Sequence, residues 1–234
     1  MPLSCKFKTS QHIVKNQDYF AIILAVLISC GGFCLNAETV IIGSMLISNL
    51  TKPFTNLVVA LYKLKWKVAS LSILDIIYMT FITILISVLC GFTIIKLFPD
   101  IKKTITQGTD AFQKYRDDEI TETELNKITA PMSCIFWRAS LIQGRPSEYI
   151  FTILIAICGG ILLARSHCQN STLNTTIIGI GISTSILPPM VAAGIFTGIG
   201  SKSSYEHASY CTLVTALNMF FIYLSYGLTL LFTW

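Results

Sequence analysis

The chain has 234 residues, of which 53% are hydrophobic and only 12% are charged, and its formal net charge is +5. Soluble globular domains carry roughly 25% charged residues, so half that share, with long apolar runs, excludes an ordinary soluble domain and predicts an integral membrane protein. The basic residues lie beside apolar runs, where they orient helices in the bilayer, so the positive charge does not indicate nucleic-acid binding.

The first half of the chain contains three apolar runs, each long enough for a membrane span, which needs roughly 17 to 25 residues. We expect these spans at residues 19–35, 39–61 and 68–98. Lys52 and Pro53 interrupt the second run. Because proline removes a backbone donor and clashes with the preceding turn, the second helix is predicted to be broken there.

A polar connector, residues 99–148, holds eight of the twelve acidic residues and separates the two apolar halves. Thr121 and Glu124 have the spacing of a capping box, which predicts a short helix. Residues 131–141 mix apolar and aromatic side chains with Arg138, which favours a helix lying at the membrane interface over a span. We interpret the charge run of the connector as a solvated face.

The second half contains three further apolar runs, which we expect to span at residues 149–164, 175–199 and about 208–234. Pro188 and Pro189 interrupt the fifth run, so the fifth helix is also predicted to be broken. The fold class that follows is all-α: a polytopic transmembrane helix bundle with about six spans.

The orientation of such a bundle follows from lysine and arginine in its short loops. With six spans, the N-terminal arm (residues 1–18), the basic loop of residues 63–67 and Arg165 fall on one side, so we expect both termini in the cytoplasm. Asn170 and Asn174 begin glycosylation acceptor sequences. In this topology they face the cytoplasm and stay without glycan.

The two apolar halves, residues 19–98 and 149–234, share an ordered series of motifs. An acid-Tyr pair is followed in each half by Cys-Gly-Gly, then by Thr-x-Ile-Ile-Gly, and then by a proline, Pro53 or Pro189. Two copies of a unit with three spans must have opposite orientations, which is the 3+3 inverted-repeat plan of many secondary transporters. The alternative is chance, because apolar sequence aligns easily with itself.

Matched helix breaks in two halves are a pointer to a binding site for a small solute or ion, and ionisable residues inside spans are costly and often functional. Simple proline kinks that shape packing are the alternative, and hydroxyl groups beside them can satisfy freed backbone groups. A Lys52–Asp75 pair and proton coupling through Asp75 are further options. The candidate site residues are Ser48, Asn49, Thr51, Lys52, Pro53, Asp75, Ser183, Thr184, Ser185, Pro188 and Pro189.

No motif for catalysis, metal binding or a cofactor is present. The sequence lacks CxxC, HExxH and Ser-His-Asp arrangements, and its cysteines lie mostly in apolar runs, where cysteine acts as a small hydrophobe. We therefore expect no enzyme, no metal site and no cofactor. Gly194-x-x-x-Gly198 allows close helix approach, which leaves a homo-oligomer open.

Two stretches, one in each half, carry longer motifs. The first is Asn36–Ser48, which reads NAETVIIGSMLIS and precedes Pro53, and the second is Thr176–Gly194, which reads TIIGIGISTSILPPMVAAG. They resemble the two signatures of the membrane proteins grouped as domain of unknown function 389. Arg145-Pro146 and Asn218 also fit. The resemblance implies a multi-pass membrane protein with no established activity.

One departure from the family pattern falls on a candidate site. Where the family usually has a Pro-Leu-Met-Gly-Pro-like stretch, this chain reads Asn49-Leu50-Thr51-Lys52-Pro53, so that a lysine stands in the break. Two functions stay open. The first is a transporter or channel for a small solute or ion, with the lipid bilayer as its other partner. The second is a membrane scaffold or assembly protein that transports nothing.

Overall fold

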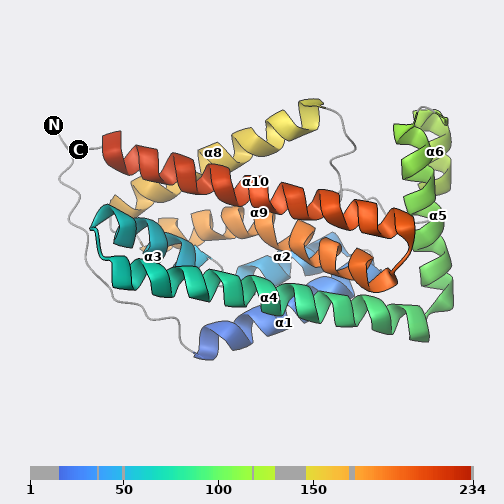
Figure 1. Cartoon of the computed structure of the whole chain (residues 1–234), viewed down its shortest axis with the longest axis horizontal. Helices are drawn as coiled ribbons and strands as arrows, with labels where there is room; N and C mark the ends of the chain where they lie inside the picture. The colour runs from blue at the N-terminus through green and yellow to red at the C-terminus, as the bar shows by residue number, and fades with distance from the viewer. Residues whose placement is uncertain are drawn as a thin grey trace.

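The computed structural model describes residues 16–35, 37–48, 51–117, 119–129, 146–168 and 172–232, and the regular structure within them is α-helical. This confirms the all-α class. The helices with apolar runs lie side by side along the long axis of the molecule (Figure 1). They are α1 (Asn16–Leu35), α2 (Glu38–Ile47), α3 (Thr51–Tyr62), α4 (Trp66–Leu97), α8 (Pro146–Cys168), α9 (Thr172–Ile199) and α10 (Lys202–Phe232).

Three helical segments within the described residues are long and apolar enough to cross a membrane: Gln17–Leu35, Trp66–Leu97 and Lys202–Phe232. Two shorter apolar stretches, Ile153–Arg165 and Ser185–Ile199, belong to α8 and α9. Within the most apolar 18-residue stretch of α4, only 17% is buried inside the molecule. Its leucine and phenylalanine side chains therefore face outward, where lipid would cover the apolar surface that water does not tolerate.

The second predicted span is interrupted, although not at the proline. Helix α2 ends at Ile47, Ser48 is extended with φ −70° and ψ 120°, and α3 begins at Thr51. Pro53 is the third residue of α3. Its missing N–H costs nothing there, because the first-turn amides of a helix have no intrahelical acceptor. The break therefore precedes Pro53 by several residues.

The prediction of a broken fifth helix is wrong, because α9 continues through Pro188 and Pro189. Proline at position 189 leaves the carbonyl of Ser185, four residues earlier, without its usual backbone donor. The side-chain amide of Asn218 on α10 replaces that donor, with Nδ2 2.7 Å from the Ser185 oxygen. A neighbouring helix thus satisfies the carbonyl that Pro189 frees inside the continuous α9.

The Gly194-x-x-x-Gly198 motif packs inside the chain, against α4. A Cβ atom at Gly194 would collide with the Ser87 side chain, and one at Gly198 would collide with the Val88 carbonyl oxygen. The contact is reciprocal, since a Cβ atom at Gly91 would lie 2.5 Å from the Ile195 oxygen. The motif therefore serves the α4–α9 crossing rather than a contact between subunits.

Two hydrophobic clusters form the core on either side of α9. The first joins α9 to α1, α2 and α4, with Ile22, Met45 and Met79 among its buried side chains. The second joins α9 to α3, α8 and α10 and includes Phe54 and Tyr226. Helix α9 is thus the central helix, which explains why its residues 186–196 are buried almost without exception.

The connector forms α5 (Pro99–Arg116) and α6 (Glu122–Thr129), which lie across one end of the bundle (Figure 1). The predicted cap of α6 is confirmed, because the Thr121 backbone N–H donates to Glu124 Oε2 at 2.9 Å. This bond and the one from the Thr121 hydroxyl lower the pKa of Glu124. The interfacial helix expected at residues 131–141 lies outside the described residues.

The connector is also docked on the bundle. Helix α5 buries Ile105 and Ala111 in the first cluster, while Asp100 and Lys103 stay exposed. The Ser203 hydroxyl at the start of α10 lies 2.7 Å from Asp110 Oδ1 and 3.0 Å from Thr109 Oγ1. The interpretation of a solvated face therefore holds for these charged side chains, whereas the opposite face of α5 is part of the core.

Candidate functional site

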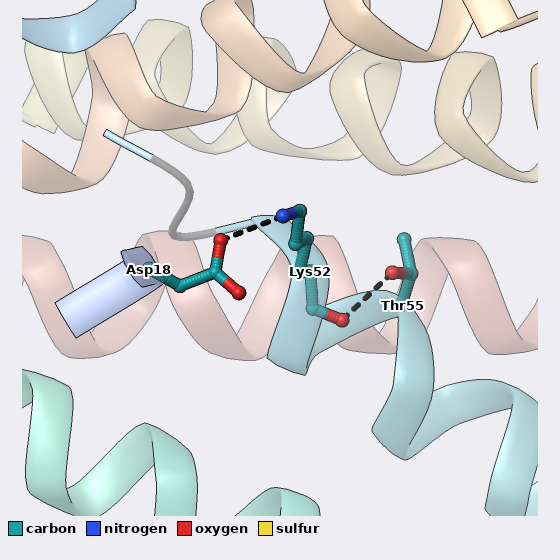
Figure 2. Close-up of polar contacts among 3 residues, drawn as sticks. All are labelled: Asp18, Lys52 and Thr55. Atoms are coloured by element: carbon teal, nitrogen blue, oxygen red, sulfur yellow. Dashed lines mark hydrogen bonds and ion pairs between the residues drawn. The ribbon is translucent and has the colours of Figure 1, made fainter. Parts of the chain in front are cut away.

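The interruption between α2 and α3 brings charged side chains into the apolar bundle. Lys52, the second residue of α3, extends its ammonium to Asp18 in the first turn of α1, with Nζ 2.6 Å from Oδ1 (Figure 2). The two partners differ in exposure: 43% of the Lys52 side chain is exposed but only 8% of the Asp18 side chain. The carboxylate is therefore the more desolvated member of the pair.

The first turn of α3 is also fixed by its own side chains. The Thr55 hydroxyl donates to the Lys52 carbonyl oxygen at 2.9 Å, which Figure 2 shows beside the ion pair. Pro53 is buried next to Lys52, and Phe54 stacks on Tyr223 of α10 with ring centroids 4.9 Å apart. The backbone that carries Lys52 is therefore anchored to the bundle, and the ammonium does not swing as part of a loose loop.

A second polar contact lies beside the first. The hydroxyl of Tyr19, the residue after Asp18, donates to Asp75 Oδ1 of α4 at 2.7 Å. The Tyr19 ring also meets Tyr78 edge to face, with centroids 5.2 Å apart. The Lys52–Asp75 pair considered from the sequence is wrong, because the Lys52 ammonium pairs with Asp18 and the Asp75 carboxylate accepts its hydrogen bond from Tyr19.

These contacts lie at one level of the bundle. Helices α3 and α4 pack against one another and are joined by the tight turn of residues 63–65. Lys52 is ten residues before Tyr62, and Asp75 is nine residues after Trp66. At ~1.5 Å per residue, both lie roughly 14 Å along the helices from that turn. We call Asp18, Tyr19, Lys52 and Asp75 the polar layer.

The polar layer is electrostatically unusual for an apolar bundle. It holds two carboxylates and one ammonium, so one formal negative charge is left after the ion pair is counted. Bare charges are expensive in a low-dielectric interior unless they are paired and hydrogen-bonded. Each carboxylate meets this requirement in a different way, Asp18 through Lys52 and Asp75 through Tyr19.

The hydroxyl groups near the predicted breaks bond mostly to their own helices. Ser48 Oγ donates to the Met45 carbonyl oxygen at 3.1 Å, and Ser185 Oγ donates to the Ile182 oxygen at 2.8 Å. Ser183 differs, since its hydroxyl is buried without a hydrogen-bond partner. For Ser48 and Ser185, the structural role considered from the sequence therefore accounts for the hydroxyl.

The structure brings only some of the sequence-predicted site residues together. Lys52, Pro53 and Asp75 lie at or beside the polar layer. Pro188 and Pro189 are buried in α9, where they form no second break. Asn49 lies outside the described residues, as do the side chains of Thr51 and Thr184, and the glycosylation candidates Asn170 and Asn174 are likewise beyond the described side chains.

Sequence reasoning missed three residues that the structure places in these networks: Asp18, Tyr19 and Asn218. Asp18 and Tyr19 were visible as the acid-Tyr pair that opens the first apolar run. The signal available was an acid within the first turn of an apolar helix, where it must find a cation or leave the membrane. Asn218 was visible as an amide in the middle of the last apolar run, which also requires a partner.

The sequence of the chain matches one family of known proteins over most of its length. The comparison with curated proteins and that with solved structures gave no match. A family model described as Domain of unknown function (DUF389) matches residues 45–224, a range that contains Lys52, Asp75, Pro188-Pro189 and Asn218. Asp18 and Tyr19 precede the matched range. Since the match covers well over half of the 234 residues, the chain belongs to the DUF389 family.

Proposed function

We propose that the chain crosses the membrane six times, as two three-span halves with opposite orientation. The spans are α1, the interrupted pair α2–α3, α4, α8, α9 and α10. The opposite chain directions of α4 and α10, the third span of each half, support this plan (Figure 1). The matched Cys-Gly-Gly motifs give it less support, because Gly32 packs against Ile41 of α2 whereas Gly160 packs against Ile222 of α10.

Within this plan, the chain is a transporter or channel for a small solute or ion, with its pathway at the α2–α3 break. The single observation that carries the proposal is the polar layer. An ion pair and a tyrosine–carboxylate hydrogen bond lie together beside an interrupted membrane helix. Interrupted backbone at membrane depth is tolerated where it is buried in protein or lines a water-filled cavity, and discontinuous helices are where transporters place their sites.

Water access to the break tests the transport function. Single cysteines replace Ser48 and Thr55 in a background without the native cysteines, and intact liposomes are treated with a membrane-impermeant maleimide. We expect labelling at both positions, because a solute pathway must admit water. Matched controls are Phe81, whose side chain faces outward on α4, and Ala25, which is fully buried. If Ser48 and Thr55 are protected as completely as Phe81 and Ala25, the transport function is excluded.

A second function, a membrane scaffold or assembly protein, is favoured by a different observation. Helix α9 is continuous, and the Asn218 amide already donates a hydrogen bond to the carbonyl that Pro189 frees. That carbonyl is therefore not available to bind a transported ion. In a scaffold, the α2–α3 break only shapes packing. Protection of the break in the maleimide experiment, with a well-folded protein, supports this second function.

The location that we propose is an integral membrane with both termini in the cytoplasm. The turn between α3 and α4 supports this orientation, because Lys65 and Lys67 are exposed there beside Trp66. Lysine accumulates in cytoplasmic loops, and tryptophan favours the membrane–water interface. We propose no catalytic role, and the partners of this function are the lipid bilayer and one small solute or ion.

A further inference from the structure

Three cysteine side chains gather where α1 and α4 pack against one another. Cys30 is buried in the first hydrophobic cluster, and Cys34 and Cys90 are partly buried against that cluster. The thiols of Cys30 and Cys90 lie within hydrogen-bond reach of each other, and the Ser87 hydroxyl, one turn before Cys90, also reaches the Cys30 thiol. Two free thiols from different helices therefore face each other in the core.

The register of the two helices agrees with this contact. Helices α1 and α4 run in the same direction (Figure 1), and the Tyr19–Asp75 hydrogen bond sets their relative height. From that bond, Cys30 lies roughly 16 Å further along α1 and Cys90 roughly 22 Å further along α4, at ~1.5 Å per residue. A tyrosine side chain leans toward the N-terminus of its helix, which accounts for most of the difference. One parallel packing therefore carries both contacts.

Cys90 also stands where a reagent in the membrane meets the helix. It is roughly 10 Å from Leu97, the last residue of α4. Since α4 is roughly 18 Å longer than the ~30 Å hydrocarbon core, a centred crossing puts Cys90 at the boundary of that core. The neighbouring Leu89 and Phe92 side chains are more than half exposed. The Cys90 thiol is therefore reached from the membrane, whereas Cys30 lies buried behind it.

We propose that Cys30 and Cys90 are a redox-active pair that closes a disulfide between α1 and α4 on reaction with a hydroperoxide. The partly exposed Cys90 sulfur attacks the terminal peroxide oxygen, the O–O bond breaks, and an alcohol leaves, so that Cys90 becomes a sulfenic acid. The Cys30 thiol then attacks that sulfur and expels water. Two thiols and one hydroperoxide thus give one disulfide, one alcohol and one water. The inference goes beyond the proposed transport function and rests only on the crossing by α4.

The disulfide would change the shape of the bundle little and its stability more. Because the two thiols already face each other in contact, side-chain adjustment brings the sulfurs to the bond length of about 2.05 Å. The bond closes a loop of about 60 residues and so restricts the unfolded chain. Oxidation should therefore raise the unfolding temperature by about 5 °C or more, and a reductant should reverse the rise.

The test uses the full chain in detergent micelles, first reduced and then treated with cumene hydroperoxide. N-ethylmaleimide blocks the remaining thiols, and limited trypsin treatment cuts at the exposed Lys65 and Lys67, between the two cysteines. The fragments that carry α1 and α4 should stay joined on a gel without reductant and separate with dithiothreitol. Mass spectrometry of the native chain should identify Cys30 and Cys90 as the joined residues.

Matched serine variants assign the link. Cys30→Ser and Cys90→Ser should each lose it, whereas Cys34→Ser and Cys158→Ser, which remove a neighbouring thiol and a remote one, should keep it. The mass spectrum of the native chain identifies the joined residues even where a serine variant does not fold.

Three outcomes overturn the inference. The native fragments separate without reductant after the hydroperoxide treatment, or the link survives in Cys30→Ser or Cys90→Ser, or the mass spectrum joins a different pair of cysteines. Maleimide access to the α2–α3 break is measured in a background without the native cysteines, so its result bears on the transport function and leaves the thiol pair untouched.

Discussion

At the scale of single residues, Asp18 and Tyr19 hold the charged and polar contacts between helices. Asp18 and Tyr19 are neighbours on α1, and each engages a different helix, Asp18 through Lys52 of α3 and Tyr19 through Asp75 of α4. Breaking a buried ion pair by removing one partner is far more damaging than removing both, because it leaves an uncompensated charge. One dipeptide therefore fixes the relation of three helices.

Leu64 offers a prediction at the same scale. It has a φ of 53°, in the left-handed region, at the end of α3. Its N–H donates to the Leu61 oxygen and the next N–H, of Lys65, donates to the Ala60 oxygen, which is the Schellman pattern that usually places glycine at this position. Leu64 is 71% exposed, so its side chain contributes little packing to set against the backbone strain.

Leu64→Gly should therefore stabilise the protein, by about 0.5–1 kcal/mol, since relief of the left-handed strain outweighs the added freedom of the unfolded chain. Thermal unfolding in detergent measures the change. Leu64→Ala is the matched control, because it shortens the side chain but keeps the strain, and it should give no gain. A loss of stability in Leu64→Gly alone would contradict the strain argument.

Whole helices are governed by the way their backbone groups find partners. The sequence treats Pro53 and Pro188-Pro189 alike, yet α2–α3 is interrupted and α9 is not. The difference lies first in the position of each proline. Pro53 stands in the first turn of α3, where no intrahelical bond is lost, whereas Pro189 stands inside α9, where the Asn218 amide of α10 replaces the lost donor at the Ser185 carbonyl. A proline pattern thus marks a candidate break, whereas the position of the proline in the helix and its tertiary neighbours decide whether the helix stops there.

The link between Asn218 and Pro189 can be measured as a coupling energy. Asn218→Ala removes the donor to the Ser185 carbonyl and should cost about 1–3 kcal/mol of unfolding free energy. In a Pro189→Ala background, the backbone N–H of residue 189 is restored and can donate to the same carbonyl. The cost of Asn218→Ala should then fall to well under half. Strictly additive effects of the two substitutions would show that the amide serves another purpose.

The crossing of α4 and α9 gives a second prediction at the scale of helices. Gly198→Ala should destabilise the protein by about 2 kcal/mol, because its Cβ atom would overlap the Val88 carbonyl oxygen and backbone cannot yield cheaply. Gly227→Ala is the control, since nothing lies within 4 Å of a Cβ atom there. Chemical unfolding in detergent measures both. A change of oligomeric state in Gly198→Ala, with unchanged stability, would instead assign the motif to a subunit contact.

The whole molecule is arranged along α4, which joins the basic turn at one end to the polar connector at the other (Figure 1). Its 32 residues give a helix of roughly 48 Å, longer than the ~30 Å hydrocarbon core. A crossing that is tilted and whose ends extend into the headgroup regions would accommodate this length. The turn at residues 63–67 and helix α5 should then lie on opposite sides of the membrane.

Sidedness tests this arrangement. Single cysteines at Lys67 and Lys103, both exposed, are introduced into a background without native cysteines. In sealed vesicles of one known orientation, an impermeant maleimide should label only one of them, and permeabilisation should make the other reactive. The proposed cytoplasmic termini require Lys67 to be on the cytoplasmic side. Labelling of both residues from the same side would contradict a crossing by α4.

At this scale, the sequence alone determined the class and the positions of the helices. A chain with few charges and long apolar runs favours helices that face lipid. The reason is the free-energy cost of backbone groups without hydrogen-bond partners and of apolar surface exposed to water. The apolar runs expected at 19–35, 68–98, 149–164, 175–199 and 208–234 each lie almost wholly within a described helix. The cap of α6 was likewise local, because Thr121 and Glu124 are three residues apart.

Only the tertiary structure decided which polar residues meet. Lys52 pairs with Asp18 across 34 residues of sequence, and Tyr19 bonds to Asp75 across 56. Such contacts depend on which helices are neighbours, a property that hydrophobic periodicity leaves open because every apolar face can pack against any other. The continuity of α9 has the same origin. Local chemistry placed the apolar helices, and the packing of distant helices selected the partners of the few charges among them.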